Sequence, residues 1–269
     1  YIATSDSHTL TDGPTIFLAN DVSKIAKFYL QTAQIPEQVV TDIVEAIHWN
    51  DRINAEITKL EKAFEDGTAK DAEKEKKMNN DNRLAPEMLR LKEKIEGLRG
   101  GIKSTSLNDL FVPNRREHIR KWAKDKQLGN VFTCDISDDI VVRLMRLSDI
   151  NYSWKLLLLM GIGVFTTHKS VGYTEIMKEL ATTQKLFMII ASTDYIYGTN
   201  YQFCHGYISK DLESMTQEKA IQAIGRVGRN NIQQEYSLRF RDNNLIKKLF
   251  TKQENKPEVI NMNRLFNSE

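Results

Sequence analysis

Two arginines near the end of the chain have the type and spacing that phosphate chemistry requires. Arg226 and Arg229 lie three positions apart in residues 217–230, QEKAIQAIGRVGRN, and a glycine precedes each of them. A guanidinium group is always charged and planar, and its fork matches phosphate oxygens in two directions. Two such groups one helical turn apart suit the binding of a γ-phosphoryl group during transfer. The alternative is an exposed basic helix end, where arginine meets the negative pole of the helix dipole.

Polar side chains follow three short apolar runs, residues 15–19, 161–165 and 186–191, that are typical of buried strands. Hydroxyl and amide groups beside helix N-termini suit contacts with backbone phosphates, although capping of the helix is an alternative for each of them. In chain order the polar residues of these turns are Asn20, Asp21, Thr166, Thr167, His168, Ser192 and Thr193. The sequence groups these turns with the arginine pair at strand ends.

Helical patterns alternate with the predicted strands along most of the chain. Residues 23–30, 171–180 and 218–223 are helix-compatible, and further strands are predicted at 204–208 and 234–240. This alternation predicts an α/β fold with a mostly parallel sheet and helices on both faces. In such sheets the ligand crevice lies outside the carboxyl ends of the strands.

The middle of the chain interrupts this pattern. Heptad-like apolar spacings at 53–64 and 84–98 flank the highly charged residues 65–83, which predicts an antiparallel helical hairpin with a solvated tip. We therefore expect residues 1–34 to begin the α/β domain and 35–148 to form a mainly helical insertion, with the coiled hairpin at about 50–100. Residues 149–250 would complete the domain, and 251–269 would be a C-terminal tail. A protein partner of the hairpin is possible, but two helices packing on each other is the simpler interpretation.

Composition excludes several classes. The chain has 269 residues, 41% of them hydrophobic and 28% charged, and a net charge of +2, so nucleic-acid binding requires a local basic patch. Two cysteines form neither a disulfide framework nor a metal site, which favours a reducing, intracellular compartment. No apolar run is long enough for a membrane span, and no membrane partner is expected.

The order GIGVFTTH, IIASTDYIYGTN, QAIGRVGR, together with TIFLAND near the start, resembles the second RecA-like domain of superfamily 2 helicases. Within that superfamily it looks closest to the superkiller-type, exosome-associated group. The resemblance covers most of residues 14–32 and 150–242. It implies a RecA-like sheet, an ATP-dependent helicase activity, and ATP with Mg²⁺ as cofactor. The implied partners are single-stranded RNA or DNA and a first RecA-like domain, in cis or in trans.

The resemblance also assigns roles to individual positions. It implies that Gln222, Arg226 and Arg229 belong to the motif whose arginines reach the phosphates of ATP bound to the partner domain, with Gly225 beside them. Gly198 and Asn200 fall near the nucleotide. Nucleic-acid backbone contacts are implied for Ser192 or Thr193, for Thr166, Thr167 and His168, and for Asn20 with Asp21.

The chain departs from the family's pattern in two respects. The turn after GIGV carries Phe165, Thr166 and Thr167 where the family usually has paired histidines and a small residue. Neither a G-x-x-x-x-G-K-[ST] phosphate loop nor a D-E-x-[DH] box occurs, so the cradle for the β-phosphate and the magnesium ligands would lie on the partner domain.

The sequence leaves three functions open. The first is the C-terminal motor domain of an ATP-dependent nucleic-acid helicase. A helicase-like scaffold without catalysis, working through its hairpin, is the second, although it would have no need of Gln222, Arg226 and Arg229. The third is a double-strand DNA translocase, for which the spacing G-R-x-G-R is a poorer fit.

Overall fold

The computed structural model describes residues 13–75, 86–122, 132–196, 201–212, 215–228, 236–251, 260–261 and 264–265. Five strands, β1 to β5 in chain order, span Thr15–Leu18, Ile162–Phe165, Met188–Ala191, His205–Ile208 and Ser237–Phe240. Ten helices, α1 to α10, span Val22–Ala33, Glu37–Glu75, Pro86–Gly100, Arg116–Trp122, Asp138–Arg146, Tyr152–Leu159, Val171–Thr182, Thr193–Ile196, Gln217–Ile224 and Asn243–Phe250. A short 3₁₀ helix, η2, spans Lys210–Leu212.

All five strands are parallel and form one sheet in the order β2-β3-β1-β4-β5. Every residue of β2, β3 and β4 is buried, whereas every residue of the edge strand β5 is half-buried. A parallel sheet covered on both faces needs such continuous apolar strands. The predicted α/β fold with a mostly parallel sheet is therefore confirmed, and the sheet is consistent with a RecA-like arrangement.

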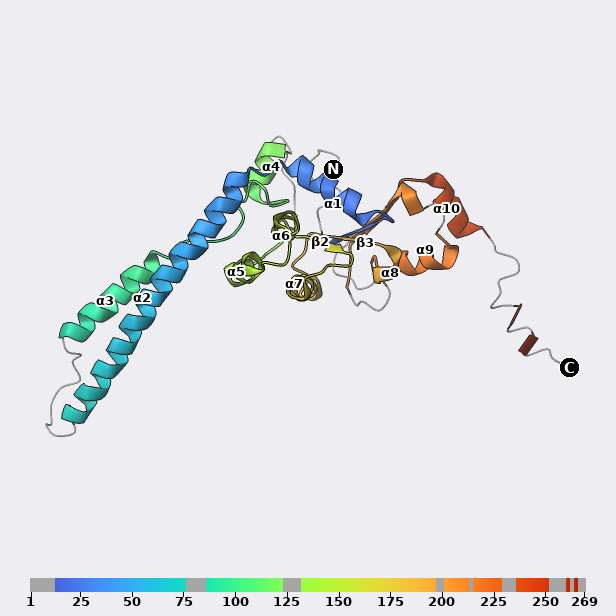
Figure 1. Cartoon of the computed structure of the whole chain (residues 1–269). Helices are drawn as coiled ribbons and strands as arrows, with labels where there is room; N and C mark the ends of the chain where they lie inside the picture. The colour runs from blue at the N-terminus through green and yellow to red at the C-terminus, as the bar shows by residue number, and fades with distance from the viewer. Residues whose placement is uncertain are drawn as a thin grey trace.

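The connections place helices on both faces. The crossover from β1 to β2 runs one way across the sheet, and the crossovers from β2 to β3, β3 to β4 and β4 to β5 run the other way. Right-handed crossovers in opposite directions lie on opposite faces. Figure 1 shows α1 on one side of the sheet and α7, α8 and α9 on the other.

Capping side chains fix where the helices that follow the strands begin. The Asp21 side chain accepts from the Lys24 N–H at 2.9 Å at the start of α1, and the Ser170 hydroxyl accepts from the Tyr173 N–H at 3.2 Å at the start of α7. Thr216 does the same for α9 through the Lys219 N–H. These caps satisfy amide groups that have no partner inside the helix.

Helices α2 and α3 form the hairpin, which extends away from the sheet (Figure 1). Ile53, Ile57 and Ile95 are buried between the two helices, with Leu60 and Leu98 packed against them. Arg99 and Glu61 add a 2.7 Å ion pair across the hairpin. The predicted hairpin is confirmed, but α2 is longer than expected because its backbone stays helical through Glu75.

The base of the hairpin is part of the main core. Ile43 and Ile47 of α2 belong to the same buried cluster as the strands, and so do Val141 and Leu144 of α5. Arg146 of α5 also pairs with Asp51 of α2 at 2.6 Å. The hairpin is thus attached to the sheet domain through buried apolar contacts as well as through charge.

Candidate phosphate and nucleic-acid site

The turn that carries Arg226 lies at the amino-terminal edge of the sheet. Phe203, just before β4, donates its N–H to the Arg226 carbonyl at 3.3 Å and accepts the Gly228 N–H at 2.9 Å. Phe203 and Val227 form an isolated parallel bridge. Since α9 runs back from the carboxyl edge, this pairing fixes the backbone of residues 225–228 beside the beginning of β4.

The two glycines of the turn differ in what they require. Gly228 has a φ of +73°, and a Cβ there would lie 3.2 Å from the Tyr236 ring. Gly225 is the C-cap of α9 with a φ of −64°, and its nearest neighbour would be the Ile221 carbonyl at 3.3 Å. Only Gly228 therefore has a conformation that L-residues rarely adopt.

Of the predicted nucleotide-contacting residues, three can be located. Gln222 and Gly225 are exposed, and Arg226 is half-buried. The helix α9 and the clamped turn bring these three residues together at one edge. Arg229, Gly198 and Asn200 lie outside the described residues.

Asn20 and Asp21 lie at the carboxyl edge, after β1, and both contact Asp211 after β4. The Asp211 Oδ2 accepts the backbone N–H groups of Asn20 and Asp21, each at 3.0 Å. The Asn20 side-chain amide also donates to the Asp211 carbonyl. These residues were predicted to contact a nucleic-acid backbone or to cap the helix. In the structure the main-chain N–H groups of both residues are hydrogen-bonded to Asp211.

His168, in the turn after β2, packs against neighbouring aromatic rings. His168 is half-buried, and its Nε2 lies 2.8 Å from the Val164 carbonyl. Its ring makes edge-on contacts with Trp154 at 5.0 Å and with Tyr173 at 4.7 Å between ring centroids. Burial lowers the pKa of His168, so the neutral ring is favoured.

The neighbours of His168 are more accessible. Thr167 is exposed and Thr166 is half-buried, and both precede α7 at the carboxyl edge of the sheet. Ser192 and Thr193 follow β3 at the same edge, and both are half-buried. An ion pair of 3.8 Å between Asp194 and Lys219 joins α8 to α9 beside them.

The predicted residues therefore form two groups at opposite edges. The hydroxyl and amide residues after β1, β2 and β3 share the carboxyl edge, as expected from a parallel sheet. The prediction that the arginine pair lies with them is wrong for the described part of the turn, because the hydrogen bonds of Phe203 fix it at the amino-terminal edge.

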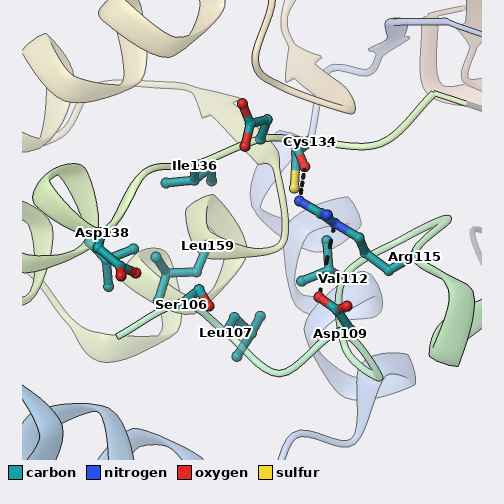
Figure 2. Close-up of a pocket in the computed structure, with 11 residues that line it drawn as sticks. Ser106, Leu107, Asp109, Val112, Arg115, Cys134, Ile136, Asp138 and Leu159 are labelled. Atoms are coloured by element: carbon teal, nitrogen blue, oxygen red, sulfur yellow. Dashed lines mark hydrogen bonds and ion pairs between the residues drawn. The ribbon is translucent and has the colours of Figure 1, made fainter. Parts of the chain in front are cut away.

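A cavity of about 310 Å³ lies apart from both groups, between residues 106–115, residues 134–138 and the end of α6 (Figure 2). Figure 2 shows Arg115 reaching toward Cys134, whose carbonyl accepts from the guanidinium Nη2 at 3.1 Å. Asp109 lies 4.0 Å from the Arg115 Nε. No motif in the sequence marked this cavity, and apolar side chains such as Leu107, Val112 and Leu159 complete its lining.

The Cys134 thiol in the lining of the cavity is buried. Burial raises the pKa of Cys134 to about 12, and the nearby Arg115 offsets this only in part. Among the described residues no group of three or more His, Cys, Asp or Glu side chains is placed to hold a metal ion.

Compared with models of protein families and with curated protein sequences, the chain matches none. No described helix combines the length and apolar composition that crossing a bilayer requires.

Proposed function

We propose that the chain is the C-terminal motor domain of an ATP-dependent nucleic-acid helicase. Arg226 and Arg229 would contact the phosphates of ATP held by a first RecA-like domain, with Gln222 and Gly225 beside them and Gly198 and Asn200 near the nucleotide. That domain would also hold Mg²⁺. Thr166, Thr167, Ser192 and Thr193, at the opposite edge, would contact the backbone of a single strand.

The clamped arginine turn is the observation that carries this proposal. Two hydrogen bonds to Phe203 and a glycine with positive φ hold the backbone of the turn in one conformation. A guanidinium that stabilises charge on a transferred phosphoryl group acts best when it is already in position before the reaction. An ordinary basic helix end would not require this rigid attachment to the sheet.

The division between the two edges also supports the proposal. A helicase motor must couple its contact with the nucleotide to its contact with the nucleic-acid strand. Two contacts on one rigid sheet move together when the domains close. The exposed Thr167 and the half-buried Ser192 and Thr193 offer hydroxyl groups at the carboxyl edge, where parallel sheets bind ligands.

The decisive experiment measures single-turnover ATP hydrolysis by the chain together with its first RecA-like domain. Arg226→Ala and Arg229→Ala should each lower the rate by on the order of a thousandfold, with a much smaller effect on ATP affinity. The double variant should be far from additive. Lysine should not restore activity at either position, because an ammonium group cannot reproduce the guanidinium fork.

Lys247→Ala, on the exposed face of α10, is the matched control and should leave the rate unchanged. Folded alanine variants of both arginines that hydrolyse ATP at the rate of the unmodified protein would favour the scaffold function instead. The chain by itself should show no strand-stimulated hydrolysis, and a turnover of about 1 to 1000 per second from it alone would contradict the proposal.

Binding of a single strand tests the other edge. Ser192→Ala with Thr193→Ala should weaken binding to a similar extent for all base sequences, because phosphate contacts carry no sequence information. The affinity should also fall steeply with salt. A base-sequence preference that disappears in this double variant would argue against contacts with the backbone.

A further inference from the structure

An exposed tryptophan lies at the base of the hairpin, where α2 leaves the sheet domain. Trp49 is 40% exposed, although the neighbouring Ile47 is buried in the main core and Ile53 in the hairpin seam. Its indole N–H donates to the Gly101 carbonyl at 2.9 Å, just after α3. The ring is therefore held in a fixed position with part of its surface in solvent.

Two cations lie against this ring. The Lys103 Nζ is 4.8 Å from the ring centroid, and the Arg52 guanidinium carbon is 5.5 Å from it. The Lys103 backbone is held beside the ring, because its N–H donates to the Asn50 Oδ1 at 2.9 Å and its carbonyl accepts from the Asn50 Nδ2 at 2.7 Å. We call Trp49, Arg52 and Lys103 the Trp49 patch.

Neither cation of the patch forms an ion pair with an acidic side chain of the described residues. None of the ion pairs found among the described residues involves Arg52 or Lys103. Asp51, next to Arg52 in the chain, pairs with Arg146 at 2.6 Å. Both cations of the patch therefore remain available to an anion from outside.

We propose that the Trp49 patch binds a single-stranded nucleic acid, with a base packed against the exposed part of the indole and the flanking phosphates on Arg52 and Lys103. Aromatic rings combined with unpaired cations bind single strands without regard to sequence, because every base has a π-face and every nucleotide carries a phosphate. An acidic polypeptide would use the two charges, but its carboxylates offer no aromatic ring to pack against the exposed indole. The choice of nucleic acid rests on the proposed function.

The patch lies on a different part of the molecule from Ser192 and Thr193. Trp49 and Arg52 lie on α2 and Lys103 follows α3, whereas Ser192 and Thr193 follow β3 at the carboxyl edge of the sheet. The hairpin of α2 and α3 extends away from the sheet (Figure 1). With a net charge of only +2, the chain has no general attraction for nucleic acid. The patch thus provides a local contact through which the hairpin would help to bind the strand.

The test measures binding of the full chain to a fluorescein-labelled 20-nucleotide single strand of mixed sequence, as RNA and as DNA, by anisotropy at several salt concentrations. Trp49→Ala should weaken binding about fivefold or more. Trp49→Phe keeps a ring without the indole N–H and should retain most of the affinity. Arg52→Gln with Lys103→Gln should weaken binding and reduce the slope of log K against log salt by about 1.4, since each phosphate contact contributes about 0.7 for single strands.

The matched control is Lys59→Gln with Lys62→Gln, which removes two exposed charges from α2 outside the patch. It should leave both affinity and slope unchanged. If the patch variants bind as this control does, while Ser192→Ala with Thr193→Ala loses affinity, the patch inference is overturned and the proposed function stands. If the patch variants lose affinity and the Ser192 and Thr193 variant does not, the patch inference holds and the proposed strand contact at the carboxyl edge fails.

Two other results would also overturn the inference. Equal competition by polyglutamate, with no loss in Trp49→Ala, would identify a surface for acidic polypeptides instead. A chain that binds neither RNA nor DNA at low salt would refute the patch together with the strand contact of the proposed function.

Discussion

Asp211 and Asn20 are 191 positions apart in the chain and hold the loops after β4 and β1 together at the carboxyl edge of the sheet. The Asp211 carboxylate accepts the Asn20 backbone N–H at 3.0 Å, and the Asn20 side chain donates to the Asp211 carbonyl. The same carboxylate accepts the Asp21 N–H at the start of α1. An internal anion thus stabilises the N-terminus of this helix, where backbone amides favour negative charge.

Asp211→Ala should lower the free energy of unfolding by about 1 kcal/mol, because it leaves two backbone amides at the α1 start without their carboxylate acceptor. Urea unfolding followed by circular dichroism measures the change. Asp194→Ala removes another exposed carboxylate at the same edge, whose ion pair with Lys219 is 3.8 Å long, and should change stability by less than about 0.5 kcal/mol. Equal losses in the two variants would mean that the bonds to Asn20 and Asp21 do not stabilise the edge.

The positions of Asn20 and Asp211 show where the sequence was informative and where it was not. Apolar runs bounded by polar turns predicted β1, β2 and β3, because a parallel sheet buried on both faces needs continuous apolar strands. The predicted strands at 204–208 and 234–240 coincide with β4 and β5, although the half-buried β5 is not an apolar run. Nothing in the sequence around Asp211 indicated a partner near residue 20, since that contact depends on β4 lying beside β1. The clamp of Phe203 on the arginine turn is likewise a tertiary contact without a local signal.

The hairpin shows a different limit. Charge in residues 65–83 suggested a solvated tip, but α2 continues through Glu75. Alanine, lysine and glutamate, which are frequent in residues 69–77, are strong helix formers, so local propensity prevailed over the charge pattern. The cavity near Arg115 was not predicted, because its lining combines loop residues with side chains of α5 and α6 that no motif in the sequence marks.

His118 should make stability depend on pH. Burial lowers its pKa to about 4, with a smaller contribution from Lys121, and its Nδ1 accepts the Asn114 N–H at 3.4 Å, which requires the neutral ring. The unfolded chain, with a histidine pKa near 6.5, binds the proton more readily than the folded chain does. The stabilisation is therefore complete above about pH 6.5 and is lost as the pH falls toward 4, by roughly 3 kcal/mol at most.

The measurement compares urea unfolding of the unmodified chain and of His118→Gln between pH 7.5 and 4. Glutamine can still accept a hydrogen bond but does not titrate in this range. The unmodified chain should lose more stability than the variant as the pH falls. If the free energy of unfolding falls equally with pH in the two proteins, protonation of His118 does not destabilise the folded chain.

His168 and Thr167 are adjacent but should respond to substitution in opposite ways. His168→Ala removes the hydrogen bond to Val164 and the ring contacts with Trp154 and Tyr173, which should cost about 2 kcal/mol of stability. Thr167→Ala, at an exposed position, should change stability by less than about 0.5 kcal/mol. If the turn contacts the nucleic-acid backbone, Thr167→Ala should weaken the binding of single-stranded nucleic acid. Thermal melting and anisotropy on the same samples measure both quantities, and a stable His168→Ala would contradict its packing role.

The two glycines of the arginine turn provide the sharpest comparison, because the sequence placed one before each arginine without distinguishing them. Gly228→Ala forces an L-residue into a φ of +73° and brings its Cβ to 3.2 Å from the Tyr236 ring. The left-handed conformation alone should cost about 1 to 2 kcal/mol. Gly225→Ala keeps a φ of −64° at the end of α9, where alanine is well tolerated, and should change stability by less than about 0.5 kcal/mol.

With the first RecA-like domain present, Gly228→Ala should also slow ATP hydrolysis, because a displaced turn moves Arg226 away from the phosphates. Gly228→Ala should therefore be both less stable in urea unfolding and slower in single-turnover hydrolysis than Gly225→Ala. Equal stability and equal rates would show that the bonds between the turn and Phe203 do not hold the arginine in place.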